Sequence, residues 1–185
     1  RDSIDYRVKY LNKNINFIDT AGLRRRGKIE QGIEKYSSIR TIKSVERADV
    51  WILILSAEEM ITSQDLHISG FIKDLMRPCI IVMNKFDLVS ADQKEKIIEE
   101  ISEKFNHIPK IPILLTSALK EINIDKIIPM AIEVYENSIK RVAQKELNSC
   151  FIDAISKKQP ASKGKKSPEI FSISQYKISP PGFKF

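Results

Sequence analysis

The sequence has few of the residues that mark disulfide-rich, metal-binding or membrane-spanning proteins. Its 185 residues include only two cysteines and two histidines. Cys79 and Cys150 lack the spacing of a metal site, so we expect both to be reduced, buried thiols. No apolar run approaches the roughly 18 to 20 residues that a membrane-spanning helix needs, and the charged amino terminus is unlike a signal peptide. We therefore expect a cytoplasmic protein with no membrane span.

The charge is divided unevenly along the chain. Residues 1–138 contain 21 basic and 21 acidic residues, whereas residues 139–185 contain 10 basic and 3 acidic residues. This asymmetry predicts a neutral globular domain joined to a module that binds a polyanion, and nucleic acid is the polyanion we expect. The alternative is a solvated, flexible tail, although the aromatic and aliphatic residues of this segment suit a small folded core.

Apolar runs alternate with amphipathic segments through most of the chain, which predicts an α/β sheet with right-handed crossovers. Asp5–Leu11 should pair antiparallel with Ile15–Ile18 and add one antiparallel edge strand to an otherwise parallel sheet. Further strands are predicted at Val50–Leu55, Cys79–Met83 and Ile111–Thr116, and helices at Glu34–Arg47, Thr62–Met76, Ala91–Phe105 and Ile124–Val142. Beyond these segments we expect a helix at Lys145–Ser156 and a strand at Glu169–Ile178.

Three polar motifs follow apolar strands, and parallel strands should bring them to one edge of the sheet. They are Asp19, Thr20, Ala21 and Gly22; Asn84, Lys85 and Asp87; and Ser117, Ala118 and Leu119. A carboxylate at Asp87 can accept hydrogen bonds from the ring N–H and the exocyclic amine of guanine, a match that adenine lacks. The stem of Lys85 can cover a base face, and Asn84 can tie loops together. The three motifs together therefore predict a guanine-nucleotide site.

The order D-T-A-G, N-K-x-D, S-A-L resembles the translation-factor-type GTPases. Residues 1–5, 19–28 and 46–50, with the triple arginine at 24–26, more narrowly resemble the second GTPase domain of the bacterial Der (EngA) family. That resemblance implies a second GTPase domain at 1–142 and a KH-like domain beginning at 143–185. The implied fold is a P-loop GTPase-type three-layer sheet followed by a partial α+β domain.

The resemblance also implies the cofactors, the partners and the roles of residues. It implies GTP or GDP with Mg²⁺, and it leaves open whether K⁺ assists. Asp19 would reach Mg²⁺ through water, Gly22 would donate its N–H to the γ-phosphate, and Leu23 occupies the position of a water-orienting Gln. Hydrolysis would then be slow without an activating partner. The partners implied are the large ribosomal subunit with its rRNA and a first GTPase domain of the same chain.

One motif of such GTPases is absent. The sequence has no G-x-x-x-x-G-K-[ST] loop to bind phosphates. We therefore expect a piece truncated at both ends, without its first core strand, phosphate loop and first helix, and inactive alone. Glu121 and Asn123 stand where the family often has glycines, and Glu121 is the less suited to left-handed backbone.

Two other functions stay open. The chain could act as a nucleotide-free RNA- or ribosome-binding fragment, or it could belong to a related tRNA-modification-type GTPase. A KH domain normally clamps nucleic-acid backbone with a G-x-x-G loop, and this sequence has none. RNA contact would then depend on the lysines of the basic segment, namely Lys157, Lys158, Lys163, Lys165 and Lys166.

Overall fold

A computed structural model describes residues 5–18, 47–59, 61–108, 110–157 and 172–185. The chain divides into two compact units, residues 1–134 and residues 135–185. The predicted domain boundary at residue 142 stays a prediction. The helix predicted at Glu34–Arg47 lies outside the described residues, apart from its last position.

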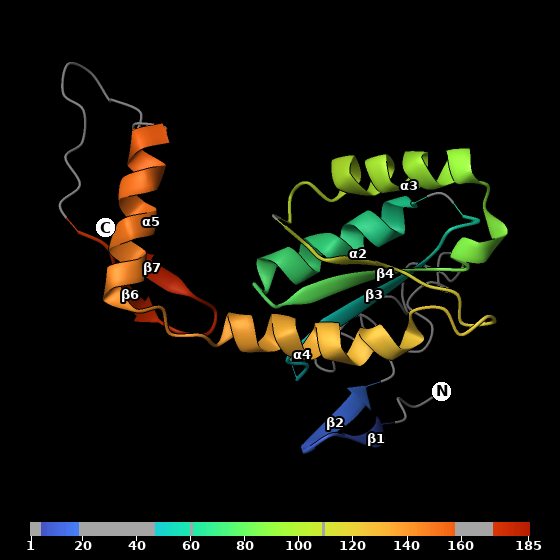
Figure 1. Cartoon of the computed structure of the whole chain (residues 1–185), viewed down its shortest axis with the longest axis horizontal. Helices are drawn as coiled ribbons and strands as arrows, with labels where there is room; N and C mark the ends of the chain where they lie inside the picture. The colour runs from blue at the N-terminus through green and yellow to red at the C-terminus, as the bar shows by residue number, and fades with distance from the viewer. Residues whose placement is uncertain (1–4, 19–46, 60, 109, 158–171) are drawn as a thin grey trace, which may run out of the picture. The chain divides into compact units, whose positions relative to one another are not determined.

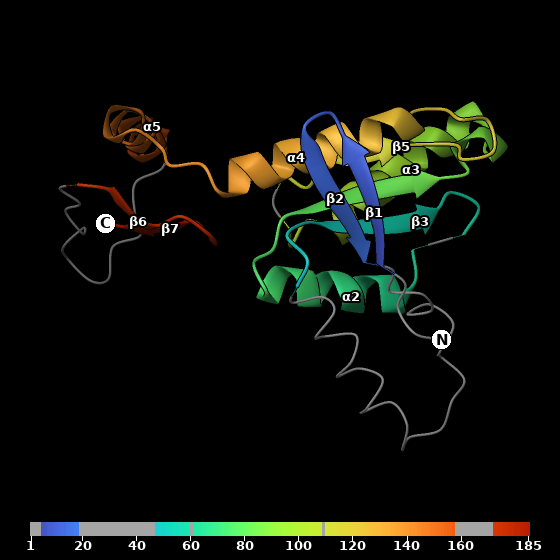
Figure 2. The same cartoon turned by 90° about the horizontal axis from the view of Figure 1, so that it is seen from below.

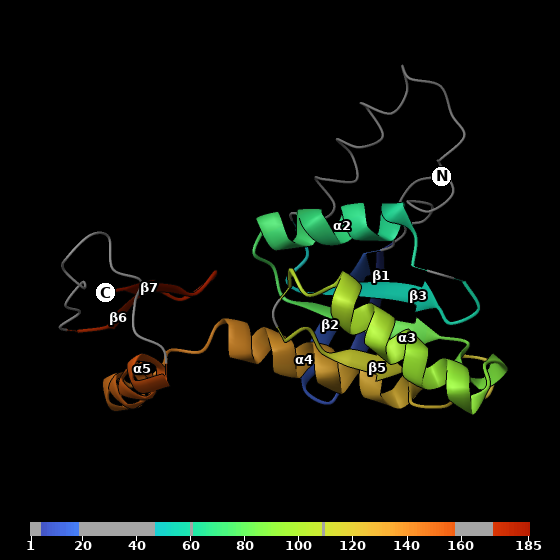
Figure 3. The ribbon, with the colours of Figure 1, turned by 90° about the horizontal axis from the view of Figure 1, so that it is seen from above.

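The first unit contains a three-stranded parallel sheet (Figure 1) in the order β3 (Trp51–Ser56), β4 (Cys79–Asn84) and β5 (Ile113–Leu115). The crossovers are α2 (Ser63–Asp74) and α3 (Ala91–Lys104). Figures 1 and 3 show both helices on one face of the sheet. After β5, a short 3-10 turn leads into α4 (Ile127–Ser138), which ends four residues before the predicted position. These elements confirm the α/β fold with a parallel sheet.

The core of this unit lies between the sheet and the two crossover helices. Ile80 and Ile81 are fully buried, which agrees with the continuous apolar run of β4, although Ile80 is not part of the core cluster. Ile81 and Ile101 are fully buried within that cluster. The cluster around them is formed mainly by Leu53, Leu55, Ile72, Cys79, Met83 and Phe105. Burial raises the pKa of the Cys79 thiol to about 12, so this thiol stays protonated at neutral pH. The prediction of a buried Cys150 is wrong, because this residue is exposed on α5 (Gln144–Lys157).

The opening hairpin differs from the prediction. β1 (Asp5–Tyr10) pairs antiparallel with β2 (Lys13–Ile18), as expected. Among the strands that the structure describes, however, the hairpin forms its own two-stranded sheet and adds no edge strand to the parallel sheet (Figure 2). The physical reason is that turn residues and alternation determine which strands pair locally. They do not determine which sheet the pair joins. The 60% exposure of Tyr6 agrees with a hairpin that is not covered on both faces.

The second unit combines α5 with a hairpin of β6 (Ser174–Lys177) and β7 (Gly182–Lys184). The Gln144 side chain donates to the carbonyl of Ile173 at 2.6 Å, and the Gln175 side chain accepts from the Val142 amide at 2.9 Å. The ring centroids of Phe151 and Phe185 lie 5.9 Å apart. A strand was predicted at 169–178, and its described part is the shorter β6, at Ser174–Lys177.

Within the described residues, no helix is both long and apolar enough to cross a membrane.

Candidate functional site

Two of the three predicted motifs meet at one edge of the parallel sheet. Asn84 is the last residue of β4, and Ser117 lies two residues beyond β5. In the register, Met83 pairs with Leu115 and Ser56 pairs with Asn84, so the three strands end nearly level. The first motif, residues 19–22, lies outside the described residues, as does Leu23. Its predicted place beside the others therefore stays a prediction.

The side chain of Asn84 links the two loops that follow β4 and β5. Its Oδ1 atom accepts a hydrogen bond from the Ala118 amide at 3.0 Å and another from the Thr116 hydroxyl at 3.3 Å. The backbone adds a further link, because the Phe86 amide donates to the Thr116 carbonyl at 3.0 Å. The structure thus brings the N-K-x-D and S-A-L motifs together through direct contacts.

A cavity of about 180 Å³ opens between these loops. It is lined by Glu58, Asn84, Lys85, Asp87, Leu88, Ser117, Ala118 and Leu119. Six of these eight residues were predicted as site residues from the sequence. Glu58 and Leu88 were not, since neither belongs to a motif. Leu119 is 86% exposed at the rim, where an apolar side chain can cover one face of a planar ligand.

Asp87 supplies a buried, ionised acceptor to this cavity. Its side chain is only 5% exposed, and the nearest charge is the Lys120 ammonium, 3.5 Å from Oδ2. Among the described residues, Oδ2 has no hydrogen-bond partner. A hydrogen bond from the Ser117 hydroxyl is the main cause that lowers the pKa of Asp87, Lys120 lowers it further, and partial desolvation opposes them. Lys120 is thus the charge partner of this oxygen, and a hydrogen bond to it is left for a ligand to make.

Lys85 leaves the strand in an unusual backbone conformation. It is left-handed, with φ 61° and ψ 28°, at the start of a 3-10 turn formed by Phe86–Leu88. Its ammonium lies 2.7 Å from Oε2 of Glu58, and both side chains are close to half exposed. A non-glycine residue with positive φ is uncommon and often marks a functional loop.

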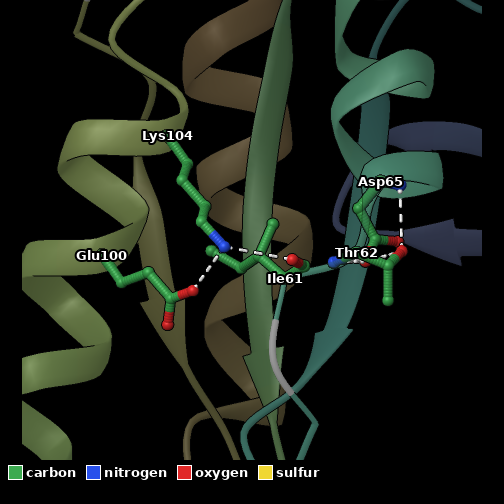
Figure 4. A network of polar contacts seen from close by, with 5 residues as sticks. All are labelled: Ile61, Thr62, Asp65, Glu100 and Lys104. Atoms are coloured by element: carbon green, nitrogen blue, oxygen red, sulfur yellow. Dashed lines mark hydrogen bonds and ion pairs between the residues drawn. The ribbon is translucent and has the colours of Figure 1, made fainter.

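The loop that carries Glu58 is anchored at its far end by a polar network (Figure 4). The Lys104 ammonium donates to the carbonyl of Ile61 at 3.2 Å and pairs with Glu100 at 2.6 Å. Thr62 then caps α2: its hydroxyl accepts from the Asp65 amide, and the Asp65 carboxylate accepts from the Thr62 amide at 3.0 Å. This capping box confirms the predicted helix start and fixes where the loop ends.

The loop after Ser117 closes through two left-handed residues. Ser117 and Ile122 form an antiparallel bridge, and Glu121 and Asn123 have φ values of 56° and 57°. The Asn123 side chain donates to the Leu115 carbonyl at 2.9 Å. Both positions that were compared with glycines thus adopt the conformation that glycine favours, and Asn tolerates it better than Glu.

The structure describes one of the five lysines that were predicted to contact RNA. Lys157 ends α5 and pairs with Asp153 at 2.7 Å, one helical turn earlier. Lys158, Lys163, Lys165 and Lys166 lie outside the described residues, so their role stays a prediction.

The described side chains fit the base of a guanine nucleotide. Asp87, whose Oδ2 has no hydrogen-bond partner among the described residues, lines a cavity whose other walls include Lys85 and Ala118. The residues expected to approach phosphate and Mg²⁺, Asp19 and Gly22, lie outside the described residues. The fit is therefore to the base, and it carries no geometry for the metal.

Comparison with known proteins agrees with this fit. The family described as elongation factor Tu GTP binding domain matches residues 3–137. GTPase Der of Citrifermentans bemidjiense is 40% identical over 186 residues, which covers 99% of this chain and 42% of the relative. GTPase Der of Clostridium botulinum (strain Langeland) is 40% identical over 187 residues, which covers 100% of this chain and 43% of the relative. The chain thus spans about two fifths of the length of the curated relatives it matches.

Solved structures show the same fold. Era in complex with MgGDPNP and nucleotides 1506–1542 of 16S ribosomal RNA has a TM-score of 0.60 and 28% sequence identity, covering 71% of this chain and 44% of that one. The parallel sheet, its strand-end cavity and the match over residues 3–137 define the class. The chain belongs to the elongation factor Tu GTP-binding domain family of GTPases. Within that class it is a homologue of the bacterial GTPase Der proteins over its whole length.

Proposed function

We propose that this chain is the guanine-binding part of a GTP-hydrolysing switch protein that acts in assembly of the large ribosomal subunit. The observation that carries the proposal is the buried Oδ2 of Asp87, which has an ion pair with Lys120 but no hydrogen-bond partner among the described residues, at a cavity closed by the Asn84–Ala118 contact. Residues 1–142 would form the second GTPase domain of a Der-type protein, and residues 143–185 would begin its KH-like domain. The site of action would be the cytoplasm.

Each predicted site residue has a distinct task in this proposal. Asp87 accepts the ring N–H and the exocyclic amine of guanine, and the Ala118 amide lies at the edge that would meet the guanine oxygen. Lys85 and Leu119 cover the two faces of the base. Mg²⁺, when bound through Asp19, neutralises phosphate charge. Gly22 is the donor to the γ-phosphate, and Leu23 cannot orient water by hydrogen bonding.

The base assignment can be tested on the 185-residue chain by titration with GDP, IDP and ADP. The readout is the chemical shift of the Ala118 amide in two-dimensional NMR spectra, at nucleotide concentrations up to millimolar. IDP lacks the exocyclic amine, so it should bind about tenfold more weakly than GDP. ADP should bind more weakly still. Equal affinity for GDP and ADP, or no response to GDP, would refute the guanine assignment.

The charge partition supports a second candidate function. The basic carboxyl-terminal segment, with 10 basic and 3 acidic residues, suits a nucleotide-free RNA- or ribosome-binding module. Its binding to rRNA should weaken steeply with salt. A chain ending at Ser138 that binds rRNA as well as the whole chain would contradict this function.

A further inference from the structure

One residue that lines the cavity comes from a loop outside the recognised motifs. Glu58 lies two residues beyond β3, and its carboxylate accepts from the Lys85 ammonium at 2.7 Å. Lys85 is the residue whose stem would cover guanine. An acidic side chain that forms an ion pair with this ammonium at the cavity wall can determine where the stem lies.

The backbone holds Glu58 beside Lys85. Ser56 and Asn84 are paired in the β3–β4 register, and the Ala57 amide donates to the Asn84 carbonyl at 2.8 Å. A tight turn follows, because the Glu59 amide donates to the Ser56 carbonyl at 3.1 Å. The sheet ladder thus extends one bond past β3 and places Glu58 next to the first residue after β4. The contact follows from strand register as well as from attraction between two flexible side chains.

The backbone of Lys85 limits the ways in which this side chain can be held. Its left-handed conformation is fixed by the turn that delivers Asp87 to the cavity. The stem, however, has four rotatable bonds, and holding such a side chain in one rotamer lowers its conformational entropy. An ion-pair partner can hold the ammonium before the nucleotide binds. Less conformational entropy of the side chain is then lost on binding.

We propose that Glu58 is a positioning residue of the guanine pocket, which holds the Lys85 side chain along the wall where it covers the base. The proposal depends on the function proposed above and adds to it a residue from a third loop. Glu58 acts through Lys85 and makes no contact with the nucleotide of its own. Because both side chains are close to half exposed, the effect is modest: loss of the pair should weaken GDP binding about two- to fivefold.

A double-mutant cycle tests whether Glu58 acts through Lys85. Glu58→Gln removes the charge at nearly constant shape, and Lys85→Met keeps most of the stem without the ammonium. GDP dissociation constants for the native chain, both single variants and the double variant are measured by NMR titration. In the native background Glu58→Gln should weaken GDP binding about two- to fivefold. In the Lys85→Met background the same substitution should have no further effect.

A matched control and a salt series separate this effect from general electrostatics. Asp153→Asn breaks another exposed ion pair of 2.7 Å, with Lys157 in the second unit, and should leave GDP affinity unchanged. The difference between Glu58→Gln and the native chain should shrink in high salt, because exposed pairs are screened.

The possible failures have different meanings. If Glu58→Gln binds GDP as tightly as the native chain, the positioning role is wrong while the guanine site stands. If Glu58→Gln costs as much in the Lys85→Met background as in the native background, Glu58 contacts the nucleotide directly and the proposal is again wrong. A third outcome is a native chain that is folded, with resolved Asp87 and Ala118 signals that GDP does not shift. In that case both the guanine site and the role of Glu58 are refuted.

Discussion

Replacing Asn84 with alanine tests the contact that joins the two guanine-binding loops. The Asn84 side chain holds the Ala118 amide at 3.0 Å and the Thr116 hydroxyl at 3.3 Å. Alanine removes the acceptor for both donors at the end of the central strand. We expect the first unit to lose stability and the Ala118 loop to lose its fixed position.

The burial of the two donors sets the size of the loss. Thr116 is 1% exposed, but its hydroxyl also lies 3.4 Å from the Met83 carbonyl and can turn to that acceptor. The Ala118 amide is near solvent, so water can replace Asn84 there. Neither donor is left fully unsatisfied, and each hydrogen bond then contributes its net value of about 0.5–1.5 kcal/mol. For the two hydrogen bonds together, the expected loss is about 1–3 kcal/mol in the free energy of unfolding.

The single tryptophan makes this loss measurable. Trp51 begins β3 and packs against the core cluster of the first unit, so its fluorescence reports unfolding of that unit in urea. Asn84→Asp keeps an acceptor at the same position and should be less destabilised than Asn84→Ala at neutral pH. If Asn84→Ala is as stable as the native chain, or if Asn84→Asp loses as much as Asn84→Ala, the loop-tying role of Asn84 is wrong.

Four further outcomes are expected from the same geometry. Asp87→Asn should weaken GDP binding and favour xanthosine diphosphate (XDP), because an amide N–H can donate to the second oxygen of xanthine. NMR titration with both nucleotides checks this, and an unchanged preference for GDP would contradict it. The pKa of Asp87 is lowered in the folded chain, so its stabilising contribution is present above the unfolded pKa of about 3.9 and is lost as pH falls through the lower folded value. Urea titrations at successive pH values should therefore show a steeper loss of stability in acid for the native chain than for Asp87→Asn. Thr62→Ala should cost about 1 kcal/mol by removing the cap of α2, again read from Trp51 fluorescence, and an unchanged urea midpoint would argue against the capping box. Glu121→Gly should stabilise the first unit by up to about 1 kcal/mol, because φ is 56° there, and a loss of stability would show that the Glu121 side chain contributes contacts of its own.

Local signals in the sequence predicted most of the first unit. Thr62 precedes α2 and forms the capping box that such a residue favours. Ser90 forms the same motif before α3, although no cap was predicted there. The continuous apolar runs at Val50–Leu55 and Cys79–Met83 predicted the strands β3 and β4. Val50–Leu55 was expected to be buried on both faces, but Ile54 is 58% exposed there, whereas five of the six residues of β4 are buried. These features could be predicted because each depends on residues only a few positions apart.

Features that depend on distant neighbours were predicted less well. The hairpin of β1 and β2 has a clear local pattern, yet its membership in the parallel sheet was predicted wrongly, since no local residue encodes which strand lies beside it. Cys150 lies in an amphipathic segment, and its periodicity could not show which face would be covered. The end of α4 at Ser138 likewise has no proline or glycine to mark it.

The candidate site shows the same division. Asn84, Asp87, Ser117 and Ala118 were found because each lies directly after an apolar strand in a recognisable motif. Glu58 lies two residues beyond β3, as Ser117 does beyond β5, so the strand-end rule applies to it as well, but Ser56–Glu59 matches no motif. Only the register, with Ser56 opposite Asn84, shows that the third strand end belongs to the cavity. The rule that ligands lie beyond the carboxyl ends of parallel strands should therefore be applied to every strand of such a sheet. At this edge of the sheet, the rule identifies Glu58, which forms an ion pair with Lys85.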